Sequence, residues 1–296
     1  MATLSLRKRT AAHAVPRSGR THVTRGVIGA YVMVVLYALT LVLPLYWLLI
    51  SAFKPRLQIL NEPFVPTFSS GFAHFVKVWK ILDMGTALLN SLYITAASLA
   101  VTLIISIPAS YGLARSRGRT ATLMERIYAL GFLIPGFAAL VPTLLLAIHM
   151  GLFYQREFMI LYLPASAQPL TVILLTQFMR TVPSSLEESA MIDGAGRLRI
   201  LWSVYLPLTV PGIASVTILN FISFWNEYLY TLVIVGVDPA LRTSQVALPT
   251  LQGNQGITDY ALVCAGTVLS VLPVFVVYAI LNRRMENALV QGALKG

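Results

Sequence analysis

The chain has 296 residues, of which 57% are apolar and 11% are charged, with a mean hydropathy of +0.75. Soluble domains carry about 25% charged residues, so this composition excludes a soluble globular enzyme and a disordered chain. The single cysteine, Cys264, cannot form an internal disulfide, which excludes a bridged secreted scaffold. The formal charge of +11 lies in short segments between long charge-free runs, so we interpret it as a membrane-topology signal and not as a nucleic-acid surface.

Six runs are free of Asp, Glu, Lys and Arg, and each reaches the roughly 20 residues that a helix needs to cross the hydrocarbon core. Because no ten-residue alternating pattern recurs, a closed β-barrel is excluded. We therefore predict an all-α polytopic membrane protein with six transmembrane helices in a domain over 26–283. The predicted spans are 26–53, 86–114, 124–150, 158–180, 208–236 and 260–282.

The distribution of basic residues predicts the orientation of the chain. Sixteen of the 22 Lys and Arg residues fall on the side that carries both chain ends, and six fall on the other side. By the positive-inside rule, both termini face the cytoplasm. Residues 1–25 form a basic arm without an apolar stretch, so we expect no cleavable signal peptide, and residues 284–296 form a cytoplasmic tail.

Two patterns occur near the first two spans. Between residues 54 and 83, four apolar residues share one helical face, which predicts a short helix resting on the outer membrane surface. Small hydroxyl residues recur at helical spacing in the second span, which favours close helix packing over substrate contact. The apolar set is Phe72, Phe75, Val76 and Trp79, and the hydroxyl set is Ser91, Thr95, Ser98 and Thr102.

His149 has no second ligand at i+3 or i+4, so no metal site is expected there.

The most informative segment lies between the fourth and fifth spans and covers 183–207. Ser184 and Glu187, directly after Pro183, fit a capping box, so a short helix should run to about Ile192. The sequence Asp193-Gly194-Ala195-Gly196 then breaks this helix, because glycine permits the backbone of a tight turn.

A second amphipathic helix is predicted after this turn, with Leu198, Leu201, Trp202 and Tyr205 on one face. Pro207 marks the return into the membrane. The product is a helix–turn–helix along the cytoplasmic surface. Such a unit suits the transmission of force from a soluble partner, but the pattern alone favours an interfacial helix that only anchors the loop.

The same segment resembles the signature loop of binding-protein-dependent ABC importer permeases. Their pattern is Glu-Ala-Ala, three residues, Gly, nine residues, Ile, one residue, Leu-Pro. Here Glu188-Ser189-Ala190 stands for the triplet, Gly194 follows after three residues, and nine residues later comes Val204-Tyr205-Leu206-Pro207. Serine replaces one alanine and valine replaces isoleucine, while the spacing is intact over twenty residues.

Further motifs resemble the sugar-type branch of these permeases, in particular the second permease of the maltose importer. Their order and positions carry the resemblance, which covers nearly the whole chain after residue 25. The motifs are Ser51-Ala52-Phe53-Lys54-Pro55, Asn90-Ser91-Leu92, Ser110-Tyr111-Gly112-Leu113-Ala114-Arg115, Trp225-Asn226-Glu227-Tyr228 and the last six residues, 291–296.

The resemblance implies the type I ABC importer permease fold with a cytoplasmic coupling helix. It implies a permease that moves a sugar or sugar derivative across the cytoplasmic (inner) membrane of a prokaryote by alternating access. The implied partners are a second permease in a heterodimer, two cytoplasmic ATPase subunits and an extracytoplasmic solute-binding protein. ATP and Mg would bind to the ATPase, since the sequence has no Gly-Lys pair and hence no P-loop. We therefore expect that this chain is not an enzyme and binds no cofactor or metal.

In such importers the signature helix docks into a cleft on the ATPase subunit. By position, Glu188 would contact the ATPase, Gly194 would form the sharp turn, and Leu206-Pro207 would lead to the fifth span. The ATPase-coupling residues implied in this way are Glu187, Glu188, Ala190, Asp193, Gly194, Arg197, Leu206 and Pro207. The tail residues Gly292, Lys295 and Gly296 are expected to reach the ATPase interface as well.

Polar residues form a stripe in the predicted fifth span, which contains Glu227, the one acidic residue well inside a span. At 100° per residue most of the stripe falls within one arc of about 100°. Hydroxyl, amide and carboxylate groups suit sugar hydroxyls, so the stripe predicts a surface that faces the substrate pathway. A buried interhelical network that holds the two permeases together fits equally well. The stripe comprises Asn220, Ser223, Asn226, Glu227, Tyr230 and Thr231.

Two other classes of membrane protein compete with the importer hypothesis. A secondary transporter or channel driven by an ion gradient should show internal repeats and several intramembrane ionisable residues. The two halves show no clear repeat, and Glu227 is alone. An intramembrane enzyme would need a nucleophile–base pair or a metal motif within the spans, and the sequence shows neither.

Overall fold

The computed structural model describes residues 25–116, 118–252 and 258–293, and every regular element within them is a helix or a helical turn. The chain divides into two units, Met1–Tyr46 and Trp47–Gly296, which we describe separately. The described part of the first unit is most of α1 (Arg25–Ser51). Its side chains from residue 27 to residue 46 are exposed around the whole helix and nearly all apolar, as a helix surrounded by lipid requires.

The second unit holds the other helices. The long ones are α4 (Met84–Arg115), α7 (Glu157–Arg180), α10 (Leu206–Trp225) and α13 (Tyr260–Ala293). The shorter helices are α2 (Arg56–Asn61), α3 (Ala73–Ile81), α5 (Arg119–Phe132), α6 (Gly136–His149), α8 (Ser184–Ile192), α9 (Arg197–Ile200), α11 (Leu229–Ile234) and α12 (Ser244–Ala247). A π turn, η1 (Leu201–Tyr205), joins α9 to α10, and a 3-10 turn, η2 (Leu248–Leu251), follows α12.

Among the described residues, five helices are long and apolar enough to cross a membrane: Val27–Ser51, Met84–Arg115, Glu157–Arg180, Arg197–Trp225 and Tyr260–Ile280. The pair α5 and α6 makes a sixth span if it is counted as one, although it bends by 95°. We predicted a single helix over 124–150. Pro135 accounts for the break, because proline lacks a backbone N–H and restricts the residue before it, so α5 ends and a new helix begins.

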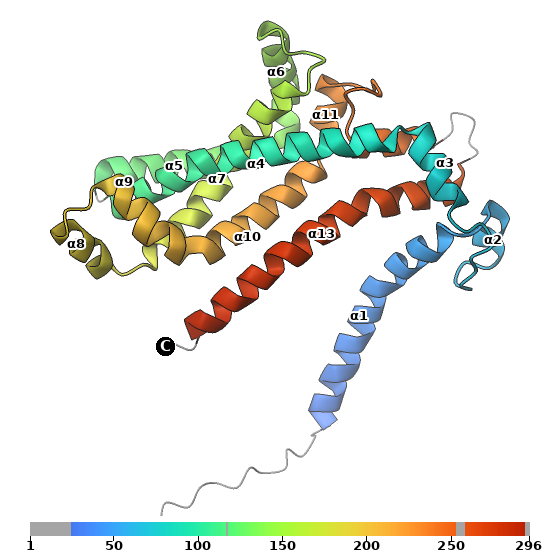
Figure 1. The fold of residues 1–296 in the computed structure, drawn as a ribbon, viewed down its shortest axis with the longest axis horizontal. Coiled ribbons are helices and arrows are strands. Elements are labelled where there is room, and N and C mark those ends of the chain that lie inside the picture. The colour runs from blue at the N-terminus through green and yellow to red at the C-terminus, as the bar shows by residue number, and fades with distance from the viewer. Residues whose placement is uncertain (1–24, 117, 253–257, 294–296) are drawn as a thin grey trace, which may run out of the picture. The chain divides into compact units, whose positions relative to one another are not determined.

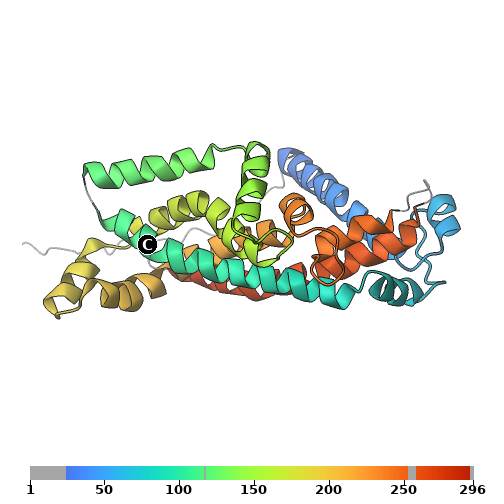
Figure 2. The same cartoon turned by 90° about the horizontal axis from the view of Figure 1, so that it is seen from above.

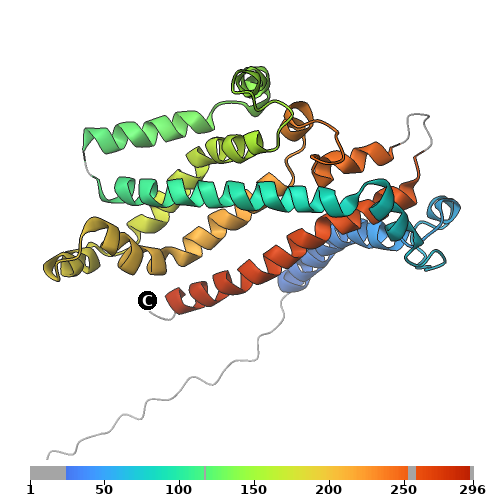
Figure 3. The same ribbon diagram turned by 45° about the horizontal axis from the view of Figure 1, so that its top comes forward.

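The helix α4 is the centre of the second unit. It runs alongside α7 and also packs against α10, while α13 packs against α10 (Figures 1 and 3). Three clusters of buried apolar residues follow one another along α4, from its first turn to its last. Their larger members are Leu82 and Met84, then Ile94, Phe158 and Phe224, then Tyr111, Met179 and Tyr205.

The hydroxyl stripe of α4 is a packing surface, as predicted. All four of its members are buried, and the stripe extends along the helix to Ser106 and Ser110. Ser110 Oγ donates to the carbonyl oxygen of Val172 in α7 across 3.2 Å, and Thr102 Oγ1 donates within its own helix. Small side chains let two helix backbones approach closely, so α4 and α7 pack as one block.

The predicted surface helix is α3, which runs beside the first turns of α13 (Figure 1). Phe72, Val76 and Trp79 are exposed on it, whereas Val78 on the opposite face is fully buried. The preceding loop holds a fully buried cation, Lys54. Its Nζ donates to the carbonyl oxygens of Glu62 at 2.8 Å and of Pro63 at 3.3 Å, so a charged group holds the chain that leaves α2.

Candidate functional site

The helix α8 lies at the end of the second unit where α4 finishes, together with α9 (Figures 1 and 2). It ends at Ile192 as predicted, and Gly194 has a φ of +79°, which confirms the sharp turn. The turn is closed by hydrogen bonds from Gly194 N to the Met191 carbonyl at 3.0 Å and from Ala195 N to the Ala190 carbonyl at 2.9 Å. A left-handed residue with two such bonds is a common way to end a helix.

The predicted capping box is wrong. The helix starts at Ser184 with Pro183 as its N-cap, and no side chain caps it. Glu187 does not reach back, because its carboxylate is bound elsewhere: Oε1 accepts a hydrogen bond from the Tyr111 hydroxyl at 3.2 Å, and Oε2 accepts one from the Tyr205 hydroxyl at 2.9 Å. Three stronger contacts outside the helix outweigh one capping bond.

The third contact is an ion pair with Arg115, the last residue of α4, whose Nε lies 3.0 Å from Oε2 of Glu187. The guanidinium of Arg115 also lies over the Tyr205 ring, 4.7 Å from its centre, and donates to the carbonyl oxygen of Val182 at 2.7 Å. The rings of Tyr111 and Tyr205 are 4.8 Å apart. We call these four residues, Tyr111, Arg115, Glu187 and Tyr205, the α4–α8 clamp.

The opposite side of α8 and α9 is open. Glu188, Asp193 and Arg197 are exposed, while Ala190 and Leu206 are half-buried and Pro207 is exposed. The exposed apolar side chains are unusually large for a surface turn, with Ile192 at 87%, Leu198 at 72% and Trp202 at 63% of full exposure. The exposed set is therefore a mixed surface of carboxylates, guanidinium groups and bulky apolar groups.

The prediction that four residues of the second helix share one buried face is wrong for two of them. Leu201 and Tyr205 are buried, whereas Leu198 and Trp202 are exposed. The predicted face therefore divides into a buried pair and an exposed pair. The buried pair lies in the π turn and joins the apolar cluster around Met179.

The polar stripe of the fifth span does not lie on one continuous helix. The helix α10 ends at Trp225 and α11 starts at Leu229, so the projection over 208–236 fails beyond the break. Within α10, Asn220 is buried and its Nδ2 donates to Thr171 Oγ1 of α7 at 2.9 Å. Ser223 and Asn226 are exposed. Tyr230 and Thr231 are buried in α11.

Glu227 lies in the break itself and is half-buried. Its Oε1 accepts a hydrogen bond from the backbone N–H of Tyr230 at 2.8 Å, which satisfies a donor in the first turn of α11. The Tyr230 ring stacks on Tyr162 of α7, with 4.1 Å between the ring centres. Glu227 thus holds the start of the short helix.

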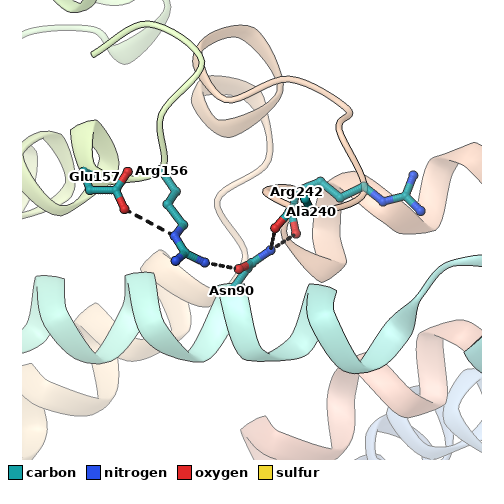
Figure 4. A network of polar contacts seen from close by, with 5 residues as sticks. All are labelled: Asn90, Arg156, Glu157, Ala240 and Arg242. Atoms are coloured by element: carbon teal, nitrogen blue, oxygen red, sulfur yellow. Dashed lines mark hydrogen bonds and ion pairs between the residues drawn. The ribbon is translucent and has the colours of Figure 1, made fainter. Parts of the chain in front are cut away.

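A polar network lies near the start of α7, at the other end of the unit from α8 (Figure 4). The amide of Asn90 uses all of its groups: Nδ2 donates to the carbonyl oxygens of Ala240 at 3.0 Å and Arg242 at 3.1 Å, and Oδ1 accepts from Arg156 at 2.5 Å. Arg156 also pairs with Glu157 at 3.4 Å. The sequence contained Asn90 only within a short motif, so this role was missed.

No group of three or more His, Cys, Asp or Glu residues that could hold a metal ion occurs in the part of the chain that the structure describes. The Nδ1 of His149 lies 2.7 Å from the carbonyl oxygen of Leu145 in its own helix. Of the tail residues, Gly292 lies in the last turns of α13, while Lys295 and Gly296 lie outside the described residues, as do residues 1–24 of the basic arm.

Comparison with known proteins identifies the family. Residues 103–287 match the family model described as binding-protein-dependent transport system inner membrane component. The diacetylchitobiose uptake system permease protein NgcG of Streptomyces coelicolor is 30% identical over 273 residues, covering 90% of this chain and 88% of that protein. The trehalose/maltose transport system permease protein MalG of Thermococcus litoralis is also 30% identical, covering 91% and 96%.

Among solved structures, a chain of a bacterial ABC transporter involved in alginate import has a TM-score of 0.75 at 24% identity, covering 91% of this chain and 99% of that one. This likeness confirms the fold, an all-α type I ABC importer permease. The comparisons give no support to a transporter or channel driven by an ion gradient. The chain is a multi-pass inner-membrane protein, and it belongs to the family of binding-protein-dependent transport system inner membrane components, the permease subunits of ABC importers.

Proposed function

We propose that this chain is one of the two permease subunits of an importer that carries a sugar or sugar derivative across the inner membrane by alternating access. The substrate class rests on the relatives, two of which are named for uptake of diacetylchitobiose and for transport of trehalose and maltose. A transporter of this kind needs an energy source outside this chain. We place ATP and Mg on two cytoplasmic ATPase subunits and substrate delivery on an extracytoplasmic binding protein.

The observation that carries the coupling role is the open surface of α8 and the turn that follows it. Ile192, Leu198 and Trp202 are exposed there beside the charges of Glu188, Asp193 and Arg197. Large exposed apolar groups rimmed by charges are typical of a protein interface. This surface would dock the ATPase, with Ala190 packed beneath it and Leu206-Pro207 leading into α10. The cytoplasm then lies on the α8 side, as the positive-inside count predicts.

We assign the substrate pathway to the end of α10 that carries Ser223 and is capped by Asn226, because these polar side chains are exposed in this subunit. Glu227 would border the pathway from the helix break. The buried members, Asn220, Tyr230 and Thr231, would support it by holding α10 and α11 in place. The tail residues Gly292, Lys295 and Gly296 would add a second contact with the ATPase.

The test is reconstitution of the complete complex in proteoliposomes, with uptake of maltose, trehalose and N,N′-diacetylchitobiose measured with and without ATP. Gly194→Val and Gly196→Val form a matched pair, since an added Cβ meets nothing within 4 Å at either position. Only Gly194 needs a left-handed backbone, which costs an ordinary residue about 1–2 kcal/mol. We expect Gly194→Val to lose ATPase association and uptake, and Gly196→Val to keep both.

Two results would contradict the proposal. Uptake that continues without ATP and stops when the ion gradient across the membrane is dissipated would assign the chain to secondary transport. Association of the ATPase that is equally strong in both glycine variants would remove the docking role from this turn.

A further inference from the structure

The segment made of α8, α9 and η1 is joined directly by the chain to α7 and to α10, but not to α4. Residues 181–183 lead from α7 into α8, and α9 and η1 lead on into α10. The helix α4 reaches the same place only through side chains, since Arg115 is its last residue. Yet α4 is the long central helix of the unit, and these side chains are its direct connection to α8.

We propose that the α4–α8 clamp is the joint that transmits movement of the coupling helix to α4, with Glu187 and Arg115 as positioning residues. This inference rests on the proposed function of α8 as the ATPase-docking helix. It gives Glu187 a role different from that of its neighbour Glu188. Glu188 would face the ATPase, whereas Glu187 would hold the docked helix to the membrane bundle.

The geometry of Glu187 supports this division. Both carboxylate oxygens are occupied by Tyr111, Arg115 and Tyr205, which come from α4 and η1. Its side chain is only 12% exposed, and that of Arg115 is 21% exposed. A carboxylate with three partners in a nearly enclosed place has little capacity left for a residue of another subunit. Adjacent Glu188 is exposed.

Arg115 connects three parts of the chain at once. It pairs with Glu187 in α8, donates to the carbonyl oxygen of Val182 before α8, and lies over the ring of Tyr205 in η1. A planar guanidinium is suited to this combination of ion pair, hydrogen bond and ring contact, and a lysine ammonium is not. The end of α4 is therefore fixed to both sides of the coupling helix.

The apolar surroundings make the joint stiff. Tyr205 is fully buried, and it packs with Ile200 and Leu201 against Met179 of α7. Behind the clamp, α4 is packed along α7 through its buried hydroxyl stripe. Close-packed interiors transmit displacement and do not absorb it. Movement of α8 would then shift α4 and α7 together.

The experiment uses the full complex in proteoliposomes and compares Glu187→Gln, Arg115→Gln and Glu188→Gln. It measures association of the ATPase subunits, the rate of ATP hydrolysis, and uptake of maltose and N,N′-diacetylchitobiose per ATP hydrolysed. Loss of a charged hydrogen-bond partner changes an equilibrium about tenfold or more. We expect Glu187→Gln and Arg115→Gln to keep the ATPase bound and hydrolysing, and to lose about tenfold in uptake per ATP.

Glu188→Gln should behave in the opposite way, with weaker ATPase association and unchanged uptake per ATP in the complexes that remain. A second readout needs no sugar: nitroxide labels on cysteines placed at the exposed residues Ser116 and Ser185 report the distance between the ends of α4 and α8. One narrow distance distribution, the same with and without ATP, is expected with the clamp intact. A broadened distribution is expected in Glu187→Gln.

If Glu187→Gln is unstable, Tyr205→Phe removes one hydroxyl only and should shift both readouts in the same direction. Loss of ATPase association in Glu187→Gln would overturn the proposal, because Glu187 would then be a docking residue. Unchanged uptake per ATP with a narrow label distance would overturn it as well. In either case a wild-type complex that imports sugar with ATP leaves the proposed function standing, whereas a wild-type complex that does not would end both.

Discussion

The hydroxyl of Tyr230 donates a hydrogen bond of 2.6 Å to the backbone carbonyl oxygen of Gly136. Each residue lies just after a break in a predicted span: Gly136 starts α6 after the 95° bend, and Tyr230 lies in the first turn of α11. The two short helices lie side by side in Figure 1. Two interrupted helices of the unit are therefore joined at their breaks by one side chain.

Tyr230→Phe removes this hydrogen bond and keeps the ring stacked on Tyr162. We expect a loss of about 1 kcal/mol in the free energy of unfolding, which corresponds to a fall of about 2–4 °C in the melting temperature. Thermal unfolding in detergent, followed by tryptophan fluorescence, measures it. The control is Tyr228→Phe, since the Tyr228 ring is partly exposed. Its melting temperature should stay within about 1 °C of the wild-type value, because surface substitutions change stability little. Equal melting of both variants would show that the bond adds nothing.

Replacing Asn90 should loosen the loop that follows α11. Asn90→Ala leaves the carbonyl oxygens of Ala240 and Arg242 without the side-chain donor that binds them, while Arg156 keeps its ion pair with Glu157 (Figure 4). Each buried group left without a hydrogen-bond partner lowers stability by about 1–3 kcal/mol. Limited proteolysis should cut near residue 240 faster than in the wild type.

Asn90→Asp sharpens this test. It keeps the contact with Arg156 but replaces the donating Nδ2 by an oxygen that faces two carbonyl oxygens. We expect it to be cut as fast as Asn90→Ala. Cutting at the wild-type rate would mean that the two hydrogen bonds donated by Nδ2 do not hold the loop.

Two glycines offer a matched test of helix packing. A Cβ at Gly212 in α10 would overlap the side chain of Phe178 in α7, whereas a Cβ at Gly112 in α4 meets nothing within 4 Å. Gly212→Ala should lower stability by about 1–3 kcal/mol. Gly112→Ala should raise it slightly, by about 0.5–1 kcal/mol, because alanine favours the helix. Melting curves of the two variants decide the point, and a stable Gly212→Ala would show that α7 and α10 separate at little cost.

The buried cation of the first loop should matter more than an exposed one. Lys54→Met keeps the length of the side chain but removes the donor to the carbonyl oxygens of Glu62 and Pro63. We expect Lys54→Met to lower the free energy of unfolding by about 1–3 kcal/mol. Lys77→Met on the exposed face of α3 should stay within about 0.5 kcal/mol. Chemical modification of lysines by an amine reagent gives a second check, since Lys54 should react much more slowly than Lys77.

The elements that the sequence predicted correctly depend on local chemistry. Gly194 requires a left-handed backbone, and the structure has one there. The hydroxyl residues of the second span recur every three or four positions, and they are buried together on one face of α4. The length of a charge-free run and the spacing of similar residues along a helix depend on residues close together in the sequence. They can therefore be recognised without knowing which distant residues those residues contact.

The predictions that were wrong concern local structures that contacts with residues distant in the sequence determine. Glu187 fits a capping box by spacing, but Tyr111 and Arg115, more than seventy positions earlier, bind its carboxylate. The span over 208–236 is apolar enough to continue, yet it breaks at Asn226, and Glu227 then holds the first turn of α11. A contact between residues far apart in the chain leaves no periodic signal, so a single sequence does not display it.

The π turn over Leu201–Tyr205 has a geometric consequence for the whole helix from Arg197 to Trp225. A π turn holds about one residue more than an α turn, and each residue of a helix advances its side chains by about 100°. If the same five residues formed ordinary α turns, everything beyond them would be rotated by about a quarter of a turn. Either Tyr205 would leave Glu187, or the polar side of α10 would face a different neighbour. The π turn therefore sets the angular phase between α9, next to the α4–α8 clamp, and α10.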